Sequence, residues 1–351
     1  MSVPQYSIIV PVYNIPEELL KNCLNALENI DVPENSTYEI IAVDDGSTAT
    51  VAGILDELEK KSSHMKVIHI KNSGVSVARN IGISIARGKW LLFVDADDCV
   101  ESDFLTTFAR MEKENPAADI FVAGYYTVSE NKKVAQTFIP PNILKIEKND
   151  PQVIRNMILS TWNNQRIADT NIGVPWAKMY RAEFFERYQL KFVPGLRRMQ
   201  DMVLNLWAFY YAETIICSAH PIYCYSVWGG SAVSRYSPNY QETAKTILEQ
   251  IQTYLHTTGQ WKALQHLYYA KGVQLLFEIY RLGCCHVQCE LTYAGKIKEM
   301  ETIAKDSIFN KAIMCASSND LTRFQRIKWI LVKYRRWRSL YWLLWLQNRL
   351  R

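Results

Sequence analysis

Several features are absent from this sequence of 351 residues, and each absence excludes a class of protein. No apolar run reaches the ~18–20 residues that a transmembrane helix needs. Glycine and proline, at 14 and 12 residues, are not enriched, which argues against fibrous or low-complexity sequence. No basic segment precedes an apolar one at the N-terminus, so we expect no signal peptide. The composition of the whole sequence, with 48% hydrophobic and 21% charged residues, is typical of a globular protein.

The eight cysteines lack a zinc-binding pattern, because Cys284, Cys285 and Cys289 lie close together without paired histidines nearby. We expect reduced and mostly buried thiols, as in a cytosolic protein. The six histidines show no ligand spacing either. The sequence therefore predicts neither a zinc site nor a disulfide framework.

Acidic residues are missing from the end of the chain. Residues 321–351 contain nine Lys and Arg and no Asp or Glu, so the first 320 residues carry a net charge of −4 although the whole chain carries +5. From residue 323 onward, apolar residues recur at steps of three or four, which predicts one amphipathic helix. Its apolar face would hold Ile327, Ile330, Leu331, Tyr334, Trp337, Tyr341, Leu344 and Trp345.

Two features of this basic tail favour a membrane surface. Tryptophan and tyrosine prefer the headgroup region, and Lys and Arg are attracted to an anionic leaflet. We therefore predict peripheral membrane contact, with the helix lying in the interface, and a cytoplasmic protein at the inner face of the cell membrane. We expect no nucleic-acid partner, because the tail's tryptophans and leucines suit a bilayer better. Packing of this face onto the helical region or onto a second subunit is the alternative.

Strands and helices alternate in the first 126 residues, which predicts an α/β fold with a mostly parallel sheet flanked by helices. Later in the chain the pattern loosens, and a boundary is expected near Pro238, followed by a helical extension. The expected strands are Tyr6–Val12, Tyr38–Val43, Lys66–Ile70, Trp90–Val94, Ile120–Tyr126, Thr214–Ser218 and Ile222–Val227. The expected helices include one capped by Asn14, Val75–Ala86, Val153–Leu159 and Met202–Tyr211, and several more are expected over Tyr240–Ala304.

Candidate chemical groups follow the ends of these strands, where parallel α/β sheets bind ligands. Asp95, Asp97 and Asp98 come directly after an apolar strand. The mutual repulsion of neighbouring carboxylates is normally offset by a bound cation. Carboxylate oxygens are suitable ligands for Mg²⁺ or Mn²⁺, and these ions also bind phosphate oxygens. The cluster thus predicts a metal–diphosphate site, and an acidic turn in which Asp98 caps the next helix is the alternative.

Two further segments are weaker signals on their own. Asp44 and Asp45 end a strand, where a carboxylate can accept a hydrogen bond from a base or a ribose. Gly74 opens a helix whose amides can face an anion, and Arg79 lies a little over one turn in. A polar turn and an ordinary surface helix are the alternatives.

Taken together, the order and spacing of these segments closely resemble family 2 glycosyltransferases with the GT-A fold. The resemblance is strong over residues 6–110 and looser to about residue 235. It rests on four segments, which are Pro11-Val12-Tyr13-Asn14, Val43-Asp44-Asp45-Gly46-Ser47, Gly74-x-Ser76-x-Ala78-Arg79-Asn80-x-Gly82 and Phe93-Val94-Asp95-Ala96-Asp97-Asp98.

The resemblance implies an inverting enzyme that moves a sugar from a nucleotide diphosphate donor, with UDP as the expected nucleotide, to an acceptor hydroxyl. The expected product is cell-surface polysaccharide or glycolipid, made on a saccharide or lipid-linked acceptor. A divalent metal, Mn²⁺ or Mg²⁺, would be held by Asp97 and Asp95. The residues expected at the nucleotide are Pro11, Tyr13, Asp44, Asp45, Arg79, Asp95 and Ser231.

The general base of such enzymes is an aspartate in a Glu-Asp pair at a helix start, and here Gln200-Asp201 matches it. Asp201 is therefore the expected base, with Asp169 and Glu183 as fallbacks, while Gln200 departs from the usual glutamate. Upstream, Trp176-Ala177-Lys178-Met179-Tyr180 resembles the family's Trp-x-Lys-x-Tyr segment. Downstream, Tyr223-x-Tyr225 and Gly230-Ser231 resemble the strand and loop that close over the donor.

These expectations divide the chain into a glycosyltransferase domain over residues 1–238, a helical region over 239–320 and the basic amphipathic tail over 321–351. Within the domain, residues 1–110 form the nucleotide-binding half and 111–238 the acceptor half. Two other functions stay open, namely a nucleotide-sugar-binding protein without catalysis and a phosphatase-like Asp-x-Asp enzyme with Asp95 as nucleophile.

Overall fold

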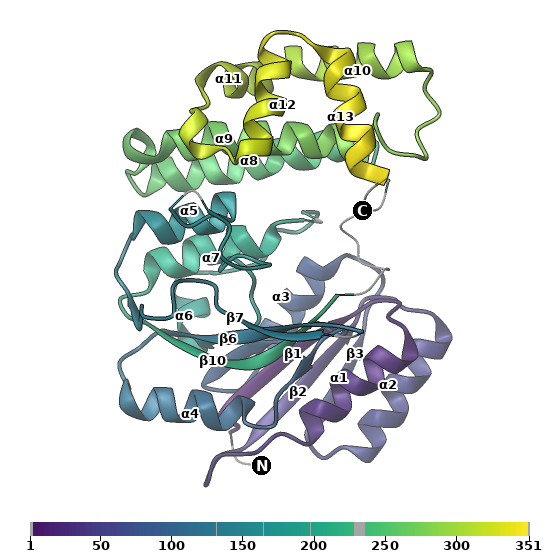
Figure 1. Ribbon diagram of the computed structural model, residues 1–351. Helices are drawn as coiled ribbons and strands as arrows, with labels where there is room; N and C mark the ends of the chain where they lie inside the picture. Colours follow the sequence, from purple (N-terminus) through teal and green to yellow (C-terminus); the bar gives the residue numbers. More distant parts are fainter. Residues whose placement is uncertain (1–2, 131, 164, 197, 228–235, 350–351) are drawn as a thin grey trace. The chain divides into compact units, whose positions relative to one another are not determined.

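The computed structural model describes residues 3–130, 132–163, 165–196, 198–227 and 236–349. They form two compact units, one of Met1–Val153 and Ile167–Trp228 and the other of Ile154–Arg166 and Gly229–Arg351. The first unit contains the sheet and the second is built of helices (Figure 1).

A sheet, ten-stranded within the described residues, forms the centre of the first unit in the order β3-β2-β1-β4-β9-β6-β10-β5, with β7 beside β6 and β8 beside β10. Strands β3, β2, β1 and β4 are parallel, whereas β9 runs antiparallel between β4 and β6. The strands are β1 (Tyr6–Val12), β2 (Tyr38–Asp44), β3 (Met65–His69), β4 (Trp90–Phe93), β5 (Cys99–Val100), β6 (Ile120–Ser129), β7 (Lys132–Gln136), β8 (Lys145–Ile146), β9 (Lys178–Arg181) and β10 (Ile215–Ser226).

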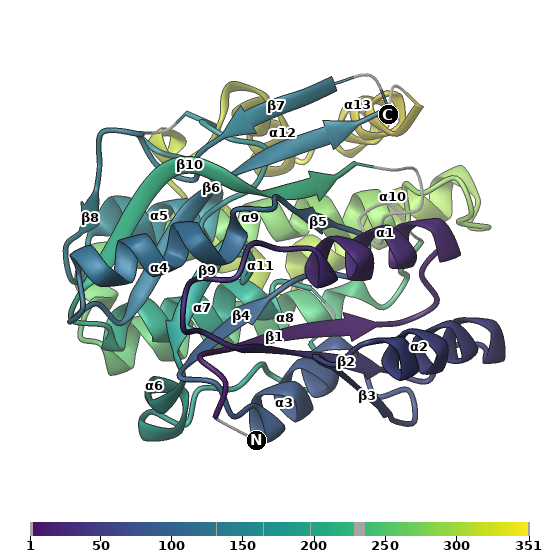
Figure 2. The same cartoon turned by 90° about the horizontal axis from the view of Figure 1, so that it is seen from below.

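Helices cover both faces of the parallel half, with α1 and α2 on one face and α3 on the other (Figures 1 and 2). This explains why β2 and β4 are buried along their whole length and read as continuous apolar runs. The predicted α/β fold is confirmed. The helices of this unit are α1 (Glu17–Glu28), α2 (Ala49–Lys61), α3 (Val75–Ile85), α4 (Phe104–Glu114), α6 (Ala182–Arg187) and α7 (Gln200–Tyr211), and α5 (Pro151–Leu159) begins in it.

Close packing of α3 against β1 accounts for one glycine of the sequence pattern. A Cβ atom on Gly82 would lie 2.4 Å from Cγ2 of Ile9, so only glycine lets α3 approach the strand this closely. That approach brings Arg79, one turn earlier in α3, toward the ends of the strands.

Hydrogen bonds tie together the turns that follow the parallel strands. The Asp45 amide donates to the Val12 carbonyl, and the Thr48 amide donates to Oδ1 of Asn14 at 2.9 Å. The predicted capping role of Asn14 is therefore wrong, since α1 begins at Glu17 after Pro16 while the Asn14 side chain joins two loops. These bonds fix the edge of the sheet where the candidate residues lie.

The second unit is helical. Helices α8 and α9 pack side by side, and the buried Arg155–Asp320 ion pair, 2.7 Å between Nη1 and Oδ1, joins two of its segments. Among the described helices, none is both long and apolar enough to cross a bilayer. The elements are α8 (Tyr240–Thr257), α9 (Trp261–Leu282), α10 (Tyr293–Lys305), α11 (Ser307–Cys315), η2 (Ser318–Asp320), α12 (Arg323–Lys333) and α13 (Trp337–Arg349).

The basic tail is two helices rather than the single helix that the sequence predicts. Arg335, between α12 and α13, lies in the left-handed region with φ of 53° and interrupts the expected continuous helix. The break rotates the second half of the expected apolar face, so that Tyr341 and Leu344 are buried while Ile327, Ile330 and Tyr334 are exposed. The tail thus contributes both to the core of this unit and to its surface.

Candidate active site

The carboxyl ends of the parallel strands bring the predicted nucleotide residues to one edge of the sheet. Tyr13 follows β1 and is 48% exposed, which leaves an aromatic face open to solvent. Pro11 lies on β1 opposite Val43 of β2. Asp44 ends β2, and Asp95 follows β4 by two residues. The topology places these residues as the strand-end argument predicts.

Asp44 and Asp45 are both buried and hydrogen-bonded within the protein. Asp44 accepts from the Ser47 amide at 2.9 Å and lies 2.7 Å from Nδ1 of His69, whose pKa is raised by this carboxylate and by Asp56. No sequence motif singles out His69. The Asp45 carboxylate accepts from two backbone amides, so it fixes the turn that leads into α3, and the donors are Ser73 at 2.6 Å and Gly74 at 2.8 Å.

The aspartates that follow β4 have different environments. Asp95 and Asp97 are partly exposed, whereas Asp98 is buried. Asp98 accepts from the Tyr223 hydroxyl at 2.6 Å and from the Ser226 amide at 2.7 Å, and burial raises its pKa. The alternative in which Asp98 caps the next helix is therefore wrong. Asp98 instead ties the acidic turn to β10.

Tyr223 holds this turn from the other side. Its hydroxyl oxygen accepts the Asp95 amide at 3.1 Å while its proton goes to Asp98. The Tyr223 ring stacks on Trp176 with centroids 4.5 Å apart, and Tyr225 stacks on the same indole at 5.4 Å. The Tyr-x-Tyr and Trp-x-Lys-x-Tyr segments noted in the sequence thus meet beneath the acidic turn.

The second residue of α7 is Asp201, the expected base. Its carboxylate accepts from Nη1 of Arg79 at 2.5 Å, and Nη2 of the same guanidinium donates to Asp95 at 2.6 Å. Burial raises the pKa of Asp201 to about 6; Arg79 opposes the rise and Asp95 adds to it. A carboxyl group with this pKa is mostly ionised at neutral pH and can then accept a proton, whereas below about pH 6 it is mostly protonated.

The start of α7 is held by the Trp-x-Lys-x-Tyr segment. The Tyr180 hydroxyl donates to Oδ1 of Asn205 at 2.8 Å, and the Asn205 amide group donates to the carbonyls of Gly173 and Asp201. Lys178 is buried and donates to the Val174 carbonyl at 2.8 Å, and burial lowers its pKa to about 7. These residues fix the backbone that carries Asp201.

Gln200, which stands where a glutamate is usual, is 7% exposed, and its Oε1 has no hydrogen-bond partner among the described residues.

The sequence pattern of the family described as Glycosyl transferase family 2 matches residues 7–188, more than half of the chain. The chain belongs to glycosyl transferase family 2.

Relatives of this glycosyltransferase include bacterial proteins. The uncharacterized glycosyltransferase EpsJ of Bacillus subtilis is 33% identical over 223 residues, which cover 64% of this chain and 61% of that protein. The putative glycosyltransferase EpsH of the same strain is 24% identical over 95% of this chain and 93% of its own length. A poly(ribitol-phosphate) beta-glucosyltransferase of Bacillus spizizenii is 31% identical over 63% of this chain, which spans 32% of that protein.

Solved structures share the fold of this glycosyltransferase. S. aureus TarS 1–349 in complex with UDP-GlcNAc has a TM-score of 0.63 at 19% identity, covering 97% of this chain and 90% of that one. The mannosyltransferase PcManGT from Pyrobaculum calidifontis, in complex with GDP-Man and Mn2+, has a TM-score of 0.52 at 12% identity, covering 98% and 85%. The predicted family and the GT-A type of fold are confirmed.

The remaining predicted site residues of the glycosyltransferase are the two fallback bases and Ser231. Asp169 is exposed and accepts from Thr127 and Gln136, and Glu183 lies on the surface within 3.9 Å of Arg187. Ser231 lies outside the described residues.

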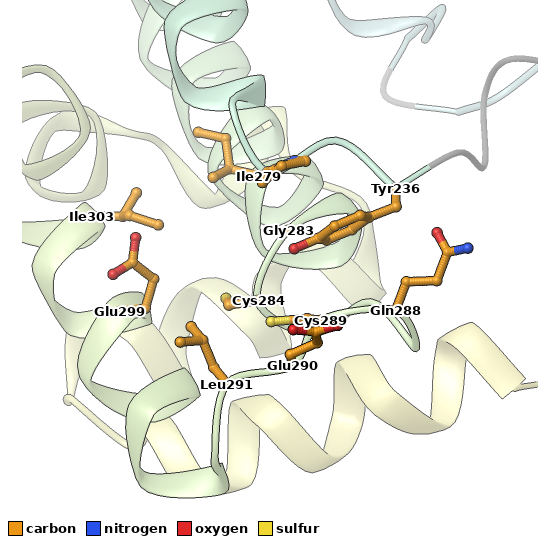
Figure 3. Close-up of a pocket in the computed structure, with 11 residues that line it drawn as sticks. Tyr236, Ile279, Gly283, Cys284, Gln288, Cys289, Glu290, Leu291, Glu299 and Ile303 are labelled. Carbon is orange, nitrogen blue, oxygen red and sulfur yellow. The ribbon is translucent and has the colours of Figure 1, made fainter.

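A separate pocket of about 450 Å³ lies in the helical unit of the glycosyltransferase (Figure 3). The segment before α8, the end of α9, the connection that follows it and α10 surround the pocket, and its lining includes Tyr236, Cys284, Gln288, Cys289, Glu290 and Glu299. It contains none of the residues that the sequence singled out for chemistry. The sheet edge is therefore the candidate active site.

Proposed function

We propose that this enzyme transfers a sugar, with inversion, from a UDP-sugar to a hydroxyl of a saccharide or lipid-linked acceptor in cell-surface polysaccharide or glycolipid synthesis. The observation that carries the proposal is the pairing of Asp95 and Asp201 through Arg79 at the carboxyl edge of the sheet. The names of TarS with UDP-GlcNAc and of the poly(ribitol-phosphate) beta-glucosyltransferase support this donor and acceptor class. Residues 1–238 would form the catalytic domain.

The nucleotide would bind across the ends of β1 and β2. The exposed Tyr13 ring offers a stacking surface for a base, and base–aromatic stacking is worth about 1–3 kcal/mol. Pro11 and Asp44 flank this surface, while Asp45 contributes by fixing the turn before α3.

A divalent cation, Mn²⁺ or Mg²⁺, fits the acidic turn. No cluster of three or more metal-ligating side chains occurs within the described part of the chain, so the protein itself offers only the partly exposed Asp95 and Asp97. Mg²⁺ is typically held by one or two carboxylates together with substrate phosphates and water. When bound, the cation neutralises charge on the departing diphosphate. Asp97 would be the main ligand, because one oxygen of Asp95 is already bonded to Arg79.

The displacement needs a base, because an acceptor hydroxyl is a poor nucleophile. Asp201 would take the proton of the hydroxyl as it attacks the anomeric carbon from the face opposite the diphosphate. The Tyr180–Asn205 hydrogen bonds hold the start of α7 and so direct Asp201 at this task.

A screen of nucleotide sugars tests the proposal. In the presence of Mn²⁺ we expect UDP or a UDP-sugar to raise the melting temperature more than other nucleotides do. Ligand at 100 times its Kd stabilises the folded state by about 2.7 kcal/mol. The preferred donor should then label a polyol or saccharide acceptor. Binding without transfer or hydrolysis would indicate a nucleotide-sugar-binding protein, and no nucleotide diphosphate binding at all would refute the proposal.

The tail is proposed to bind an anionic membrane surface at the inner face of the cell membrane. On α12 and at its C-cap, four large apolar residues at steps of three or four are between 42% and 69% exposed, namely Phe324, Ile327, Ile330 and Tyr334. Five exposed cations lie on α12 or within the next five residues of the chain, and within the described residues none of the five forms a salt bridge: Arg323, Lys333, Arg335, Arg336 and Arg338. Each basic residue near an anionic leaflet contributes about 1 kcal/mol.

We expect the full chain to sediment with vesicles that contain anionic lipid, and less so at high salt. Replacing both Ile327 and Ile330 by glutamate should abolish sedimentation, because charge then enters the apolar face. Met314→Glu is the matched control, since Met314 is an exposed apolar residue of the same unit outside the tail. Truncation is unsuitable, because Lys328, Val332 and Leu344 are buried. Equal sedimentation of the double variant and the control would contradict the membrane role.

A further inference from the structure

Arg79 lies between two carboxylates that the proposed mechanism uses for different purposes. Its side chain is 3% exposed, and its two terminal nitrogens divide between Asp201 and Asp95 at 2.5 and 2.6 Å. A guanidinium is a planar fork of donors in fixed geometry, so the position of one carboxylate constrains the position of the other. The arginine therefore links the base to the acidic turn.

The surroundings of Arg79 hold this link rigidly. The guanidinium lies over the Phe192 ring, 5.0 Å from its centroid. The neighbouring Asn80 side chain donates to the Phe192 carbonyl at 2.8 Å and accepts from the Phe192 amide at 2.9 Å. Helix α3 is thereby clamped to the segment that leads into α7, and Arg79 has little freedom to turn toward another ligand.

This geometry differs from the role that the sequence predicts, in which Arg79 contacts the nucleotide. Both terminal nitrogens already bind protein carboxylates, and Nε, which is also buried, has no partner among the described residues. Because a guanidinium has five N–H donors, a further contact is possible in principle, but turning the group toward the nucleotide would break one of the two charge-assisted hydrogen bonds in a buried setting, where such bonds are strong.

We infer that Arg79 is a positioning residue that orients the base Asp201 and couples it to Asp95. The inference rests on the proposed function, because it assigns Asp201 the role of base. Without the guanidinium, no group would bridge Asp201 and Asp95 or hold either carboxylate in place, and Asp201 would lose the contact that fixes its orientation toward the acceptor.

The test separates positioning from nucleotide binding. Arg79→Met should lower kcat by roughly 10- to 100-fold, which is part of the ~10²–10⁴-fold rate increase that a general base provides. The Kd for UDP in Mn²⁺ should change less than about threefold. Arg79→Lys should recover part of kcat, since an ammonium supplies the charge without the fork. A weaker Kd together with unchanged kcat at saturating donor would assign Arg79 to the nucleotide and overturn the inference.

A double-mutant cycle with Asp201→Asn gives a readout that a loss of stability does not mimic. If Arg79 acts through Asp201, adding Arg79→Met to Asp201→Asn should cost less than about threefold more, because groups that act as a unit are not additive. Multiplicative losses would overturn the inference. Arg155→Met is the matched control, since it breaks another buried arginine–aspartate pair and should lower stability while kcat persists.

The outcomes also distinguish this inference from the proposed function. Sugar transfer by the wild type with multiplicative losses in the cycle would refute the role of Arg79 alone. Absence of transfer from every nucleotide sugar would refute both. If Arg79→Met fails to fold, Arg79→Lys replaces it in the cycle and the same comparison decides.

Discussion

Replacing Asp201 by asparagine should reduce sugar transfer by about 10²–10⁴-fold while UDP binding in Mn²⁺ stays within a few-fold. The substitution keeps the shape of the side chain and a hydrogen-bond acceptor for Arg79, but it removes the group that can accept a proton. The measurement is kcat for transfer at saturating donor and acceptor, together with the Kd for UDP by calorimetry.

The pH profile provides an independent signature of the same residue. Burial raises the pKa of Asp201 to about 6, with Asp95 adding to the rise and Arg79 opposing it. Below that pH the carboxyl group is protonated and cannot act as a base, so kcat/KM should rise with pH through about 6 and then level off. The Asn variant should lose this acid limb.

Asp169→Asn and Glu183→Gln are the matched controls, because both residues were candidate bases and both lie on the surface. They should retain activity within a few-fold. If Asp201→Asn retains wild-type turnover while one of these two variants loses it, the base is that residue and the proposed mechanism is wrong.

The parallel half of the sheet could be predicted because β1, β2 and β4 are apolar and largely buried and because polar turns bound the strands, although the edge strand β3 is only partly buried. The strands expected at Tyr6–Val12 and Lys66–Ile70 agree with β1 and β3 to within one residue at each end. Farther along, the two short strands expected at Thr214–Ser218 and Ile222–Val227 are one strand, β10. A register shift around Pro221 lets β10 continue through a residue that normally interrupts a strand.

The candidate site could be predicted only in part. The acidic turn and Asp201 stand in short segments whose order along the chain indicates their place. The Arg79–Asp201 contact joins residues 122 positions apart, and nothing local to either residue signals it. The different exposure of Asp95, Asp97 and Asp98 could not be predicted either. Asp98 is buried where it accepts from Tyr223, which lies 125 residues later in the chain.

The tail shows why a periodic pattern does not fix a helix. Apolar steps of three or four continue through residues 334–337, yet the left-handed Arg335 divides the run. Packing decided this outcome, because the division lets Leu340, Tyr341 and Leu344 be buried within the helical unit. Periodicity along the sequence carries no information about which neighbours are available.

Replacing Asp97 by alanine should abolish detectable transfer and weaken Mn²⁺-dependent UDP binding, because this carboxylate is the proposed main ligand of the cation. Charge stabilisation by a metal on the departing diphosphate is worth several kcal/mol, which corresponds to a loss on the order of 10²–10³-fold or more. The fold should survive the change, since Asp97 is partly exposed, whereas the buried Asp98 holds the turn through Tyr223 and Ser226.

Two comparisons show whether that loss comes from the metal. In excess EDTA, the wild type and Asp97→Ala should bind UDP equally weakly, whereas added Mn²⁺ should strengthen binding to the wild type alone. Asp103→Asn is the matched control, because Asp103 is a partly exposed acid near the same turn that lies 2.6 Å from His220 and accepts from Thr107. It should keep both transfer and the response to Mn²⁺. Full activity of the wild type in EDTA, or of Asp97→Ala in Mn²⁺, would show that the acidic turn works without a cation, and Asp95 and Asp97 would then need another role at the nucleotide.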